Sequence, residues 1–238
     1  MNLFYLPGAT EGEVQLTAEE SVHCVRVLRM KAGDEVLFTD GKGWFYKGVL
    51  SRADPRGCVA DLTTRRRGDD AEGFGIHIAI GPTKQADRTE WFLEKATEIG
   101  IDEVSFFASE HSERRHVQLE RLNRVVLSAM KQSLKSRLPI LNPMVKFDEL
   151  LRKPYNGQKF IAWIDDSKRE NLYNMIRQGE KVMVLIGPEG DFSKNEVARA
   201  QSSGFLPVSL GTARLRTETA ALAACMGFHV KNQLRTDL

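Results

Sequence analysis

The feature that most limits the possible folds is an alternation of apolar runs and helical patterns after about residue 75. Five apolar runs have the length of a β-strand, and helical patterns lie between most of them. The runs are GIHIAI (75–80), EVSFFAS (103–109), KFIAWID (159–165), KVMVLIG (181–187) and FLPVSLG (205–211). Strands that alternate with helices pair in parallel, and helices then cover both faces of the sheet. We therefore expect an α/β domain built on a parallel sheet.

Polar residues at helix starts set the expected helix bounds. Three pairs have the spacing of a capping box, namely Thr17 with Glu20, Asp87 with Glu90, and Ser193 with Glu196. The helix DRTEWFLEKATEIG should end at Gly100. A long amphipathic helix is expected through HVQLERLNRVVLSAMKQSL, ending before Pro139, and a last helix should follow Thr217.

The first part of the chain has a different pattern. The short β-rich runs GDEVLFTDG, GWFYKGVLS and GCVADLTTR are separated by glycine and proline, which predicts a small β-barrel. The polar run RRRGDDAEG (65–73) is the candidate linker. We therefore expect two domains, one over residues 1–70 and one over residues 74–238.

Composition excludes several classes of protein. No apolar run approaches the roughly 20 residues that span a bilayer, and the start of the chain lacks the pattern of a secretory signal, so we expect a cytoplasmic protein without a membrane span. Cys24, Cys58 and Cys225 lie far apart, which predicts reduced thiols. His111 and His116 are five residues apart, wrong for two ligands on one helical face, and we expect no metal.

The distribution of charge is more informative than its sum. The formal net charge is only +2, but seven basic residues and one acidic residue, Glu120, lie between positions 114 and 137. The basic residues are Arg114, Arg115, Arg121, Arg124, Lys131, Lys135 and Arg137. This run is either a solvated helix face or a surface that contacts phosphates.

Two junctions between a strand and a helix are unusual. In a parallel α/β sheet, ligands bind beyond the carboxyl ends of the strands. The first junction, IGPEGDFS (186–193), combines glycines with a stiffening proline; it is either a ligand loop or an ordinary tight turn. The second, LGTARLRTETA (210–220), places Arg214, Arg216 and Glu218 at a helix start and is more polar than capping requires. Neither is a GxGxxG or GxxxxGK[ST] motif.

Five motifs in this order resemble the RsmE family, within the SPOUT superfamily of RNA methyltransferases. They are VLRMKAGDEV (27–36), EKATEIG (94–100), KQSLKSRLP (131–139), IGPEGDFS (186–193) and LGTARLRTETA (210–220). Three positions depart from the family pattern. Asp191 stands where a second glycine is usual, Lys131 stands where an acidic residue often precedes Gln132, and Val22–His23 replaces a His-His pair.

The resemblance implies a specific fold and activity. The implied fold is an amino-terminal PUA-like, RNA-binding β-barrel followed by a SPOUT parallel sheet with a carboxy-terminal trefoil knot. The implied enzyme is a homodimer that uses S-adenosylmethionine to methylate N3 of one uridine (conventionally U1498) in the decoding region of 16S ribosomal RNA, within the 30S subunit.

Motif positions assign the site residues that the resemblance implies. The cofactor-binding residues are expected to be Ile186, Gly187, Pro188, Gly190, Leu210, Gly211, Leu215, Arg216, Thr219 and Ala220. The catalytic pair is Arg216, which would stabilise the uracil anion, and Glu218, which would accept the proton or orient Arg216. Glu218 could instead be only a capping or ion-pair residue. The RNA-binding residues are expected to be Arg29, Lys84, Arg114, Arg115, Lys131 and Lys135.

Two other functions compete with this one. A SPOUT enzyme could methylate a ribose 2′-hydroxyl or a transfer RNA base instead. A protein of the same fold could also bind RNA without catalysis, and such a module would take up no S-adenosylmethionine.

Overall fold

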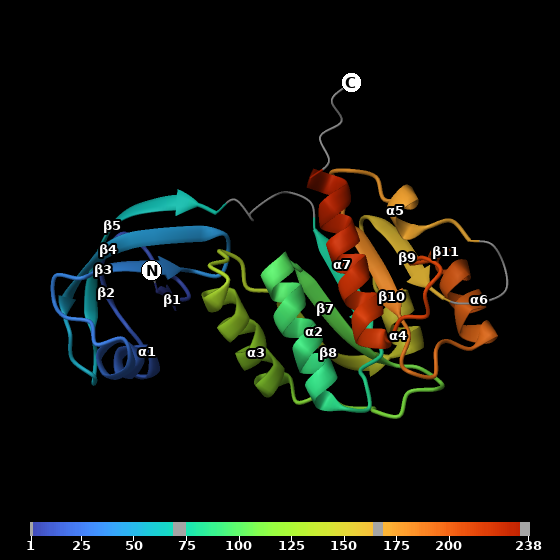
Figure 1. Ribbon diagram of the computed structural model, residues 1–238, viewed down its shortest axis with the longest axis horizontal. Helices are drawn as coiled ribbons and strands as arrows, with labels where there is room; N and C mark the ends of the chain where they lie inside the picture. The colour runs from blue at the N-terminus through green and yellow to red at the C-terminus, as the bar shows by residue number, and fades with distance from the viewer. Residues whose placement is uncertain (1, 69–74, 164–168, 234–238) are drawn as a thin grey trace, which may run out of the picture. The chain divides into compact units, whose positions relative to one another are not determined.

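The computed structural model describes residues 2–68, 75–163 and 169–233 (Figure 1). The chain forms two compact units, residues 1–72 with 127–138, and residues 73–126 with 139–238. The division expected from the sequence, at residues 70–74, separates the same two parts of the chain but leaves residues 127–138 with the second.

The first unit contains a five-stranded sheet of order β1-β3-β4-β5-β2. Its strands are β1 (Leu3–Tyr5), β2 (Gly12–Gln15), β3 (Glu35–Thr39), β4 (Trp44–Arg52) and β5 (Val59–Arg67). Strands β1 and β3 are parallel, and the other pairs are antiparallel. A short helix α1 (Ala18–Val22) continues into one turn of π-helix, η1 (His23–Val27).

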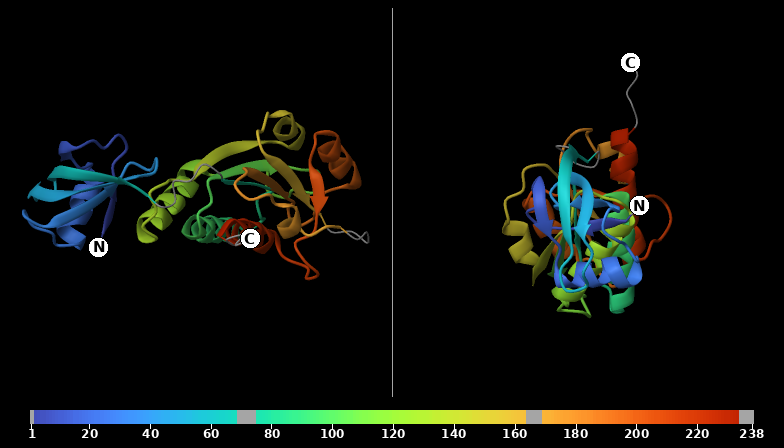
Figure 2. Two further views of the ribbon diagram at one scale, coloured as in Figure 1. Left: turned by 90° about the horizontal axis from the view of Figure 1, so that it is seen from above. Right: turned by 90° about the vertical axis from the view of Figure 1, so that its left-hand side faces the viewer.

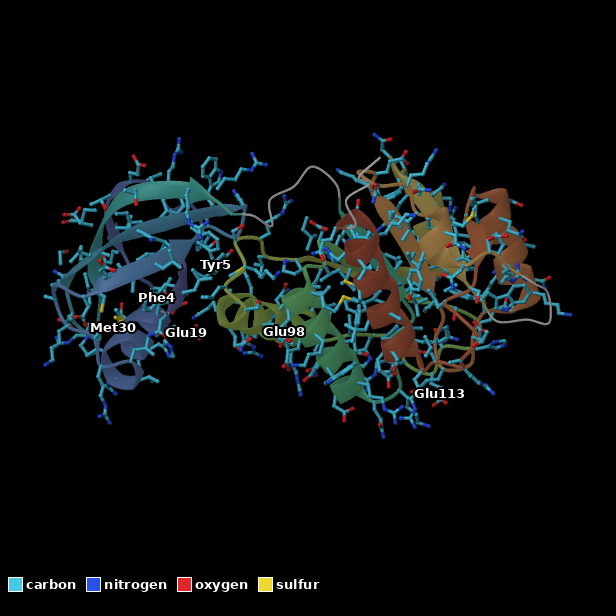
Figure 3. The ribbon with its side chains drawn as sticks, turned by 45° about the horizontal axis from the view of Figure 1, so that its top comes forward. Phe4, Tyr5, Glu19, Met30, Glu98 and Glu113 are labelled. Carbon is cyan, nitrogen blue, oxygen red and sulfur yellow. The ribbon has the colours of Figure 1, made fainter. Side chains whose placement is uncertain are left out.

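A large hydrophobic core lies against this sheet, and Leu3, Leu37 and Phe45 form a second, smaller cluster. Every strand contributes apolar side chains to the large core, including Phe4 of β1, Phe38 of β3 and Leu50 of β4, and Met30 packs against it (Figure 3 labels Phe4 and Met30). All five strands therefore bury apolar side chains in one shared core.

The predicted linker is wrong in its first part. Arg65, Arg66 and Arg67 are the last residues of β5 and pair with Tyr46, Phe45 and Trp44 of β4. The sequence signal failed because arginine has no strong preference for strands, so the hydrogen bonds to β4 decide the conformation. Residues 69–73 of the predicted linker lie outside the described residues.

The second unit is built on a six-stranded parallel sheet of order β11-β9-β10-β6-β7-β8. Its strands are β6 (Ile76–Ile80), β7 (Glu103–Ala108), β8 (Ile140–Lys146), β9 (Gln158–Ala162), β10 (Val182–Ile186) and β11 (Leu206–Val208). The parallel sheet confirms the predicted fold class. The sequence did not reveal β8, because this edge strand is largely half-exposed and contains Asn142 and Pro143.

Helices cover both faces of this sheet. They are α2 (Ala86–Ile99), α4 (Phe147–Arg152), α5 (Leu172–Met175), α6 (Lys194–Ser202) and α7 (Thr217–Gln233). Helix α3 (Leu119–Gln132) is divided between the units, because residues 127–138 belong to the first. Helices α2 and α7 pack side by side on one face, and α4 and α6 cover the other (Figures 1 and 2). Strands β6 and β10 are entirely buried between these layers.

Most of the predicted helix ends are confirmed. Thr17 caps α1, Ser193 and Glu196 form the capping box of α6, and Gly100 ends α2 with a φ of +121°. The predicted cap at Asp87 is wrong, because α2 begins at Ala86 after Gln85, which makes no side-chain cap. Asp87 lies in the first turn, where a negative charge is favourable without capping.

The three cysteines are free and buried, as predicted. No helix within the described parts of the chain is both long and apolar enough to cross a membrane.

Candidate active site

The loop after β10 is a tight turn with one residue in the left-handed region. The Asp191 N–H donates to the Pro188 carbonyl oxygen (2.9 Å), and Asp191 has a φ of +57°. Glycine adopts this conformation most easily, but aspartate tolerates it through local hydrogen bonds. Its Oδ1 atom accepts from the Phe192 N–H (2.8 Å). Asp191 therefore preserves the turn without the usual glycine.

His111, in the loop after β7, holds the glycine turn from the side. Its Nδ1 atom lies 3.0 Å from the carbonyl oxygen of Gly190 and 3.1 Å from that of Asp191. Carbonyl oxygens only accept, so Nδ1 carries the proton and donates. A Cβ atom on Gly190 would lie 2.8 Å from the His111 Cβ. Glycine is therefore required at position 190 by this close approach.

Glu196 joins the same two loops beneath the surface. Its carboxylate is almost fully buried and accepts from the backbone N–H of Glu110 (2.9 Å) and of Ser193 (2.9 Å). Buried carboxylates are stable only when they are hydrogen-bonded in this way. The loops after β7 and β10 are thus fixed to one another.

The loop after β6 completes this cluster of loops. The Gly81 N–H donates to the Ile186 carbonyl oxygen (3.0 Å), and a Cβ atom on Gly81 would lie 2.8 Å from the Pro188 nitrogen. Arg114 donates to the carbonyl oxygens of Thr83 (3.1 Å) and Lys84 (2.7 Å). These contacts order the backbone of the β6 loop beside the glycine turn.

The junction after β11 has a more open backbone. Gly211 has a φ of +121°, and a Cβ atom there would meet no other atom within 4 Å. The Ser209 hydroxyl accepts from the Gly211 N–H (3.1 Å) and donates to its carbonyl oxygen (2.9 Å). The Leu172 N–H, at the start of α5, donates to the Ser209 carbonyl oxygen (2.9 Å). This junction is therefore anchored to the segment that follows β9.

Both junctions leave the same edge of the sheet, because β10 and β11 are parallel to the strand between them. That strand is β9, so the two loops follow second neighbours in the sheet. Ile186 is the buried last residue of β10, whereas Leu210 and Leu215 are half-buried. In open α/β sheets this edge is where ligands bind.

Arg216 and Glu218 lie at the start of α7 but differ in environment. Arg216 is exposed, and its side chain has no hydrogen-bond or ion-pair partner among the described residues. Glu218 is 7% exposed, and its Oε2 atom is buried without a hydrogen-bond partner. An unpaired buried carboxylate is costly, and such groups concentrate at functional sites. This atom is the strongest sign of chemistry in the unit.

Comparisons with known proteins agree with this architecture. Residues 71–228 match the family model of an RNA methyltransferase domain, and residues 16–63 match that of an RNA methyltransferase PUA domain. The crystal structure of a probable rRNA-methyltransferase from Porphyromonas gingivalis is 43% identical, with a TM-score of 0.90 over 98% of both chains. Ribosomal RNA small subunit methyltransferase E of Bacillus subtilis is 26% identical over 92% of this chain and 90% of its own. The chain belongs to the RsmE family.

Another relative in the RsmE family has been solved with a ligand. It is the Ribosomal RNA small subunit methyltransferase E from Neisseria gonorrhoeae bound to S-adenosylmethionine. This chain is 28% identical to it, with a TM-score of 0.86 over 97% of both chains.

The residues expected to bind RNA in this RsmE chain divide between the units. Arg29, Lys131 and Lys135 belong to the first, and Lys84, Arg114 and Arg115 to the second. Lys84 pairs with Glu113 (2.8 Å), which Figure 3 labels, and Arg115 is exposed without a partner among the described residues.

Lys131 and Arg114 also have structural partners. The Lys131 ammonium lies 2.6 Å from the Glu20 carboxylate, and only 25% of its side chain is exposed. Arg114 donates to the backbone of the β6 loop. Both make internal bonds that a role in phosphate binding does not require.

Sequence reasoning missed the residues that brace the RsmE site, His111 and Glu196. Glu196 was predicted only as part of a helix cap. A signal for the β6 loop was present, since Ile-Gly-Pro occurs both at residues 80–82 and at residues 186–188. No local pattern marks His111, because its partners lie about 80 residues away in the chain.

Proposed function

We propose that this protein uses S-adenosylmethionine to methylate N3 of a uridine in small-subunit ribosomal RNA, the position conventionally called U1498. The observation that carries the proposal is the buried, unpaired Oε2 atom of Glu218 at the edge of the sheet where ligands bind. Membership of the RsmE family and the solved relative bound to S-adenosylmethionine support it. A ribosomal substrate places the activity in the cytoplasm.

The residues present fit the cofactor. Gly187 and Gly190 permit the tight first turn, because neither position has room for a side chain, and nothing lies within 4 Å of the Cβ position of Gly211 in the second. Leu210 and Leu215 would pack on the purine, while backbone groups at Ile186, Gly187 and Gly211 would bond its polar edge. Pro188, Gly190, Thr219 and Ala220 would complete this set. S-adenosylmethionine, when bound, supplies a methyl group made electrophilic by its sulfonium.

The side chains of α7 would prepare the nucleophile. N3 of uracil carries a proton at neutral pH, and that proton must leave before its lone pair can attack a methyl group. Glu218 would take this proton on Oε2, the buried atom that has no hydrogen-bond partner among the described residues. The Arg216 guanidinium, which has no partner among the described residues, would bind O2 or O4 as negative charge develops. The uridine must be unpaired for both contacts.

A Glu218→Gln variant tests the chemical role directly. Glutamine retains the shape of the side chain but cannot accept the proton, so we expect turnover to fall at least about 100-fold. Affinity for S-adenosylmethionine, measured by calorimetry, should remain unchanged. Undiminished turnover would leave Glu218 as a structural residue. Absence of cofactor binding by the wild-type protein would favour a non-catalytic RNA-binding module.

We also propose that the carboxy-terminal part of this chain forms the trefoil knot that the family resemblance implies. The chain enters β11 from α6 on one face of the sheet and continues into α7 on the opposite face. Such a change of face also occurs in unknotted sheets, so the knot is proposed from membership of the RsmE family alone. Pulling the two ends of the unfolded chain should give a contour length shorter than that of an unknotted chain, and full extension would exclude the knot.

We also infer a homodimer. Helix α7 is apolar on most of its surface, and Met226 and Val230 on it are 48% and 46% exposed. Trp91 on the neighbouring helix α2 is 44% exposed. Exposed apolar side chains on packed helices favour burial against a second copy of the chain.

A further inference from the structure

The end of strand β5 carries three consecutive arginines that the proposed active site does not use. Strand β5 pairs with β2 only through residues 59–62, so residues 63–67 have a single neighbour in the sheet, β4. Arg65, Arg66 and Arg67 are all exposed. The first unit therefore has an edge segment with dense positive charge.

Aromatic side chains of β4 hold two of these arginines. The Arg65 Cζ atom lies 5.0 Å from the centroid of the Trp44 ring, and the Arg66 Cζ atom lies 4.8 Å from that of Phe45. Successive side chains of a strand point to opposite faces, so these contacts place one guanidinium on each side of the edge. A guanidinium held over a ring keeps its N–H groups available and loses less entropy when it binds.

Further cations lie at the same end of the strands. Lys42 precedes β4 and forms a backbone bridge with Arg137, and both side chains are exposed. We call these residues the basic strand end; they are Lys42, Arg65, Arg66, Arg67 and Arg137. The carboxylate in this turn, Asp40, is buried, and its Oδ1 atom accepts from the Lys42 N–H (2.7 Å). Lys42, Arg65 and Arg66 have no ion-pair partner among the described residues.

We propose that the basic strand end binds the phosphodiester backbone of the RNA substrate. Arginine donates to phosphate oxygens in a planar fork, and a strand edge with one guanidinium on each face suits a linear chain of phosphates. The inference rests on the proposed function, since it assumes that RNA is the substrate. It adds a contact made by the first unit alone. The competing role for these charges is to prevent edge-to-edge pairing of β5 with another chain.

The test compares the double variant Arg65→Ala/Arg66→Ala with Arg56→Ala. Arg56 is an exposed arginine on the β4–β5 turn, at the opposite end of the same hairpin, and is the matched control. Binding of a fluorescent small-subunit rRNA transcript would be measured from about 50 to about 300 mM KCl. Each phosphate contact contributes about 0.7–0.9 to the slope of log affinity against log salt. We expect the slope of the double variant to be less steep by about 1–2. The control should leave the slope unchanged.

Two further measurements interpret that result. Arg65→Lys/Arg66→Lys retains the charges but not the planar fork, so the slope should be largely restored while affinity stays below that of the wild type. Affinity for S-adenosylmethionine and the melting temperature should be the same in all variants. A double variant with the wild-type slope, or a control that falls equally, would overturn the proposal. If the wild-type protein binds no rRNA, the proposed function itself fails.

Discussion

The backbone of Gly190 passes so close to His111 that a Cβ atom at position 190 would lie 2.8 Å from the His111 Cβ. The same histidine donates to the Gly190 carbonyl oxygen, so one residue both requires the glycine and fixes its backbone. The glycine turn after β10 is therefore supported from the neighbouring β7 loop.

Gly190→Ala should displace the turn. Because the new methyl group meets a side-chain Cβ and a carbonyl, backbone must move, and affinity for S-adenosylmethionine should fall at least about tenfold. Calorimetry measures this effect. In a His111→Gly background, where the facing Cβ is absent, Gly190→Ala should have a smaller effect. Equal losses in both backgrounds would show that His111 is not the reason for the glycine.

Glu218→Gln should stabilise the protein while it reduces activity. The wild-type carboxylate has a buried oxygen without a partner, and replacing the charge with a neutral amide should raise the free energy of unfolding by about 1 kcal/mol. Urea denaturation at pH 7 measures this change. A destabilised Gln variant would mean that the carboxylate stabilises the fold. It would then not be a residue kept for function at a cost in stability.

The effect of Gly227→Ala on the free energy of unfolding should depend on Tyr173 and change sign when that ring is removed. A Cβ atom on Gly227 of α7 would overlap the Tyr173 ring, and overpacking of this kind costs about 1–3 kcal/mol or more. In a Tyr173→Ala background the same substitution should stabilise α7 by up to about 1 kcal/mol, because alanine is the better helix former. Thermal denaturation of the four proteins completes the cycle, and the same sign in both backgrounds would contradict the packing.

Stability should fall in mild acid because of His77. Burial lowers the pKa of His77 to about 4, with Glu103 opposing and Lys153 adding to the shift, and its Nε2 atom lies 2.9 Å from the Ser105 hydroxyl. The unfolded chain takes up a proton below its ordinary pKa near 6.5, whereas the folded chain does so only near 4. The histidine's stabilisation is thus complete above about pH 6.5 and is lost as the pH falls towards 4, with a total of about 3 kcal/mol.

Urea denaturation between pH 7 and pH 4 tests this pH dependence in the wild type and in His77→Gln. Other carboxylates titrate in both proteins, so the difference between the two curves isolates His77. If the free energy of unfolding depended on pH equally in both proteins, His77 would have the same pKa in the folded and unfolded chains.

Val230→Glu should weaken the inferred dimer. The charge would be buried against a second copy, so we expect the dissociation constant to rise at least about tenfold. Val49→Glu is the matched control, since Val49 is a similarly exposed valine of the first unit. Light scattering across a dilution series measures the mass. Monomeric wild-type protein at all concentrations would contradict the inference.

Periodicity was sufficient for the parallel sheet because its strands are continuous apolar runs. Strands β6 and β10 are buried on both faces, and this burial is what their sequences encode. The same reasoning failed for β8 and for the end of β5, where pairing with a neighbour outweighs a weak local preference.

Only part of the candidate site could be predicted from the sequence. Glycines and polar residues at strand ends indicated the two junctions, because local conformation limits what can stand there. The brace formed by His111 and Glu196 joins loops that are far apart in the chain, and no local pattern encodes such a contact. The pairing of Lys131 with Glu20, which are 111 residues apart, was hidden for the same reason.

The central claim is transfer of a methyl group to N3 of a uridine. It is tested most directly by incubating small-subunit rRNA, free and within 30S subunits, with the protein and S-adenosylmethionine that carries a deuterated methyl group. Mass spectrometry of the released nucleosides should detect deuterated 3-methyluridine, at least about 100-fold less of it with Glu218→Gln, and oligonucleotide fragments should place it at a single position. Label on a ribose 2′-oxygen or on another base, or no label in either substrate, would contradict the account.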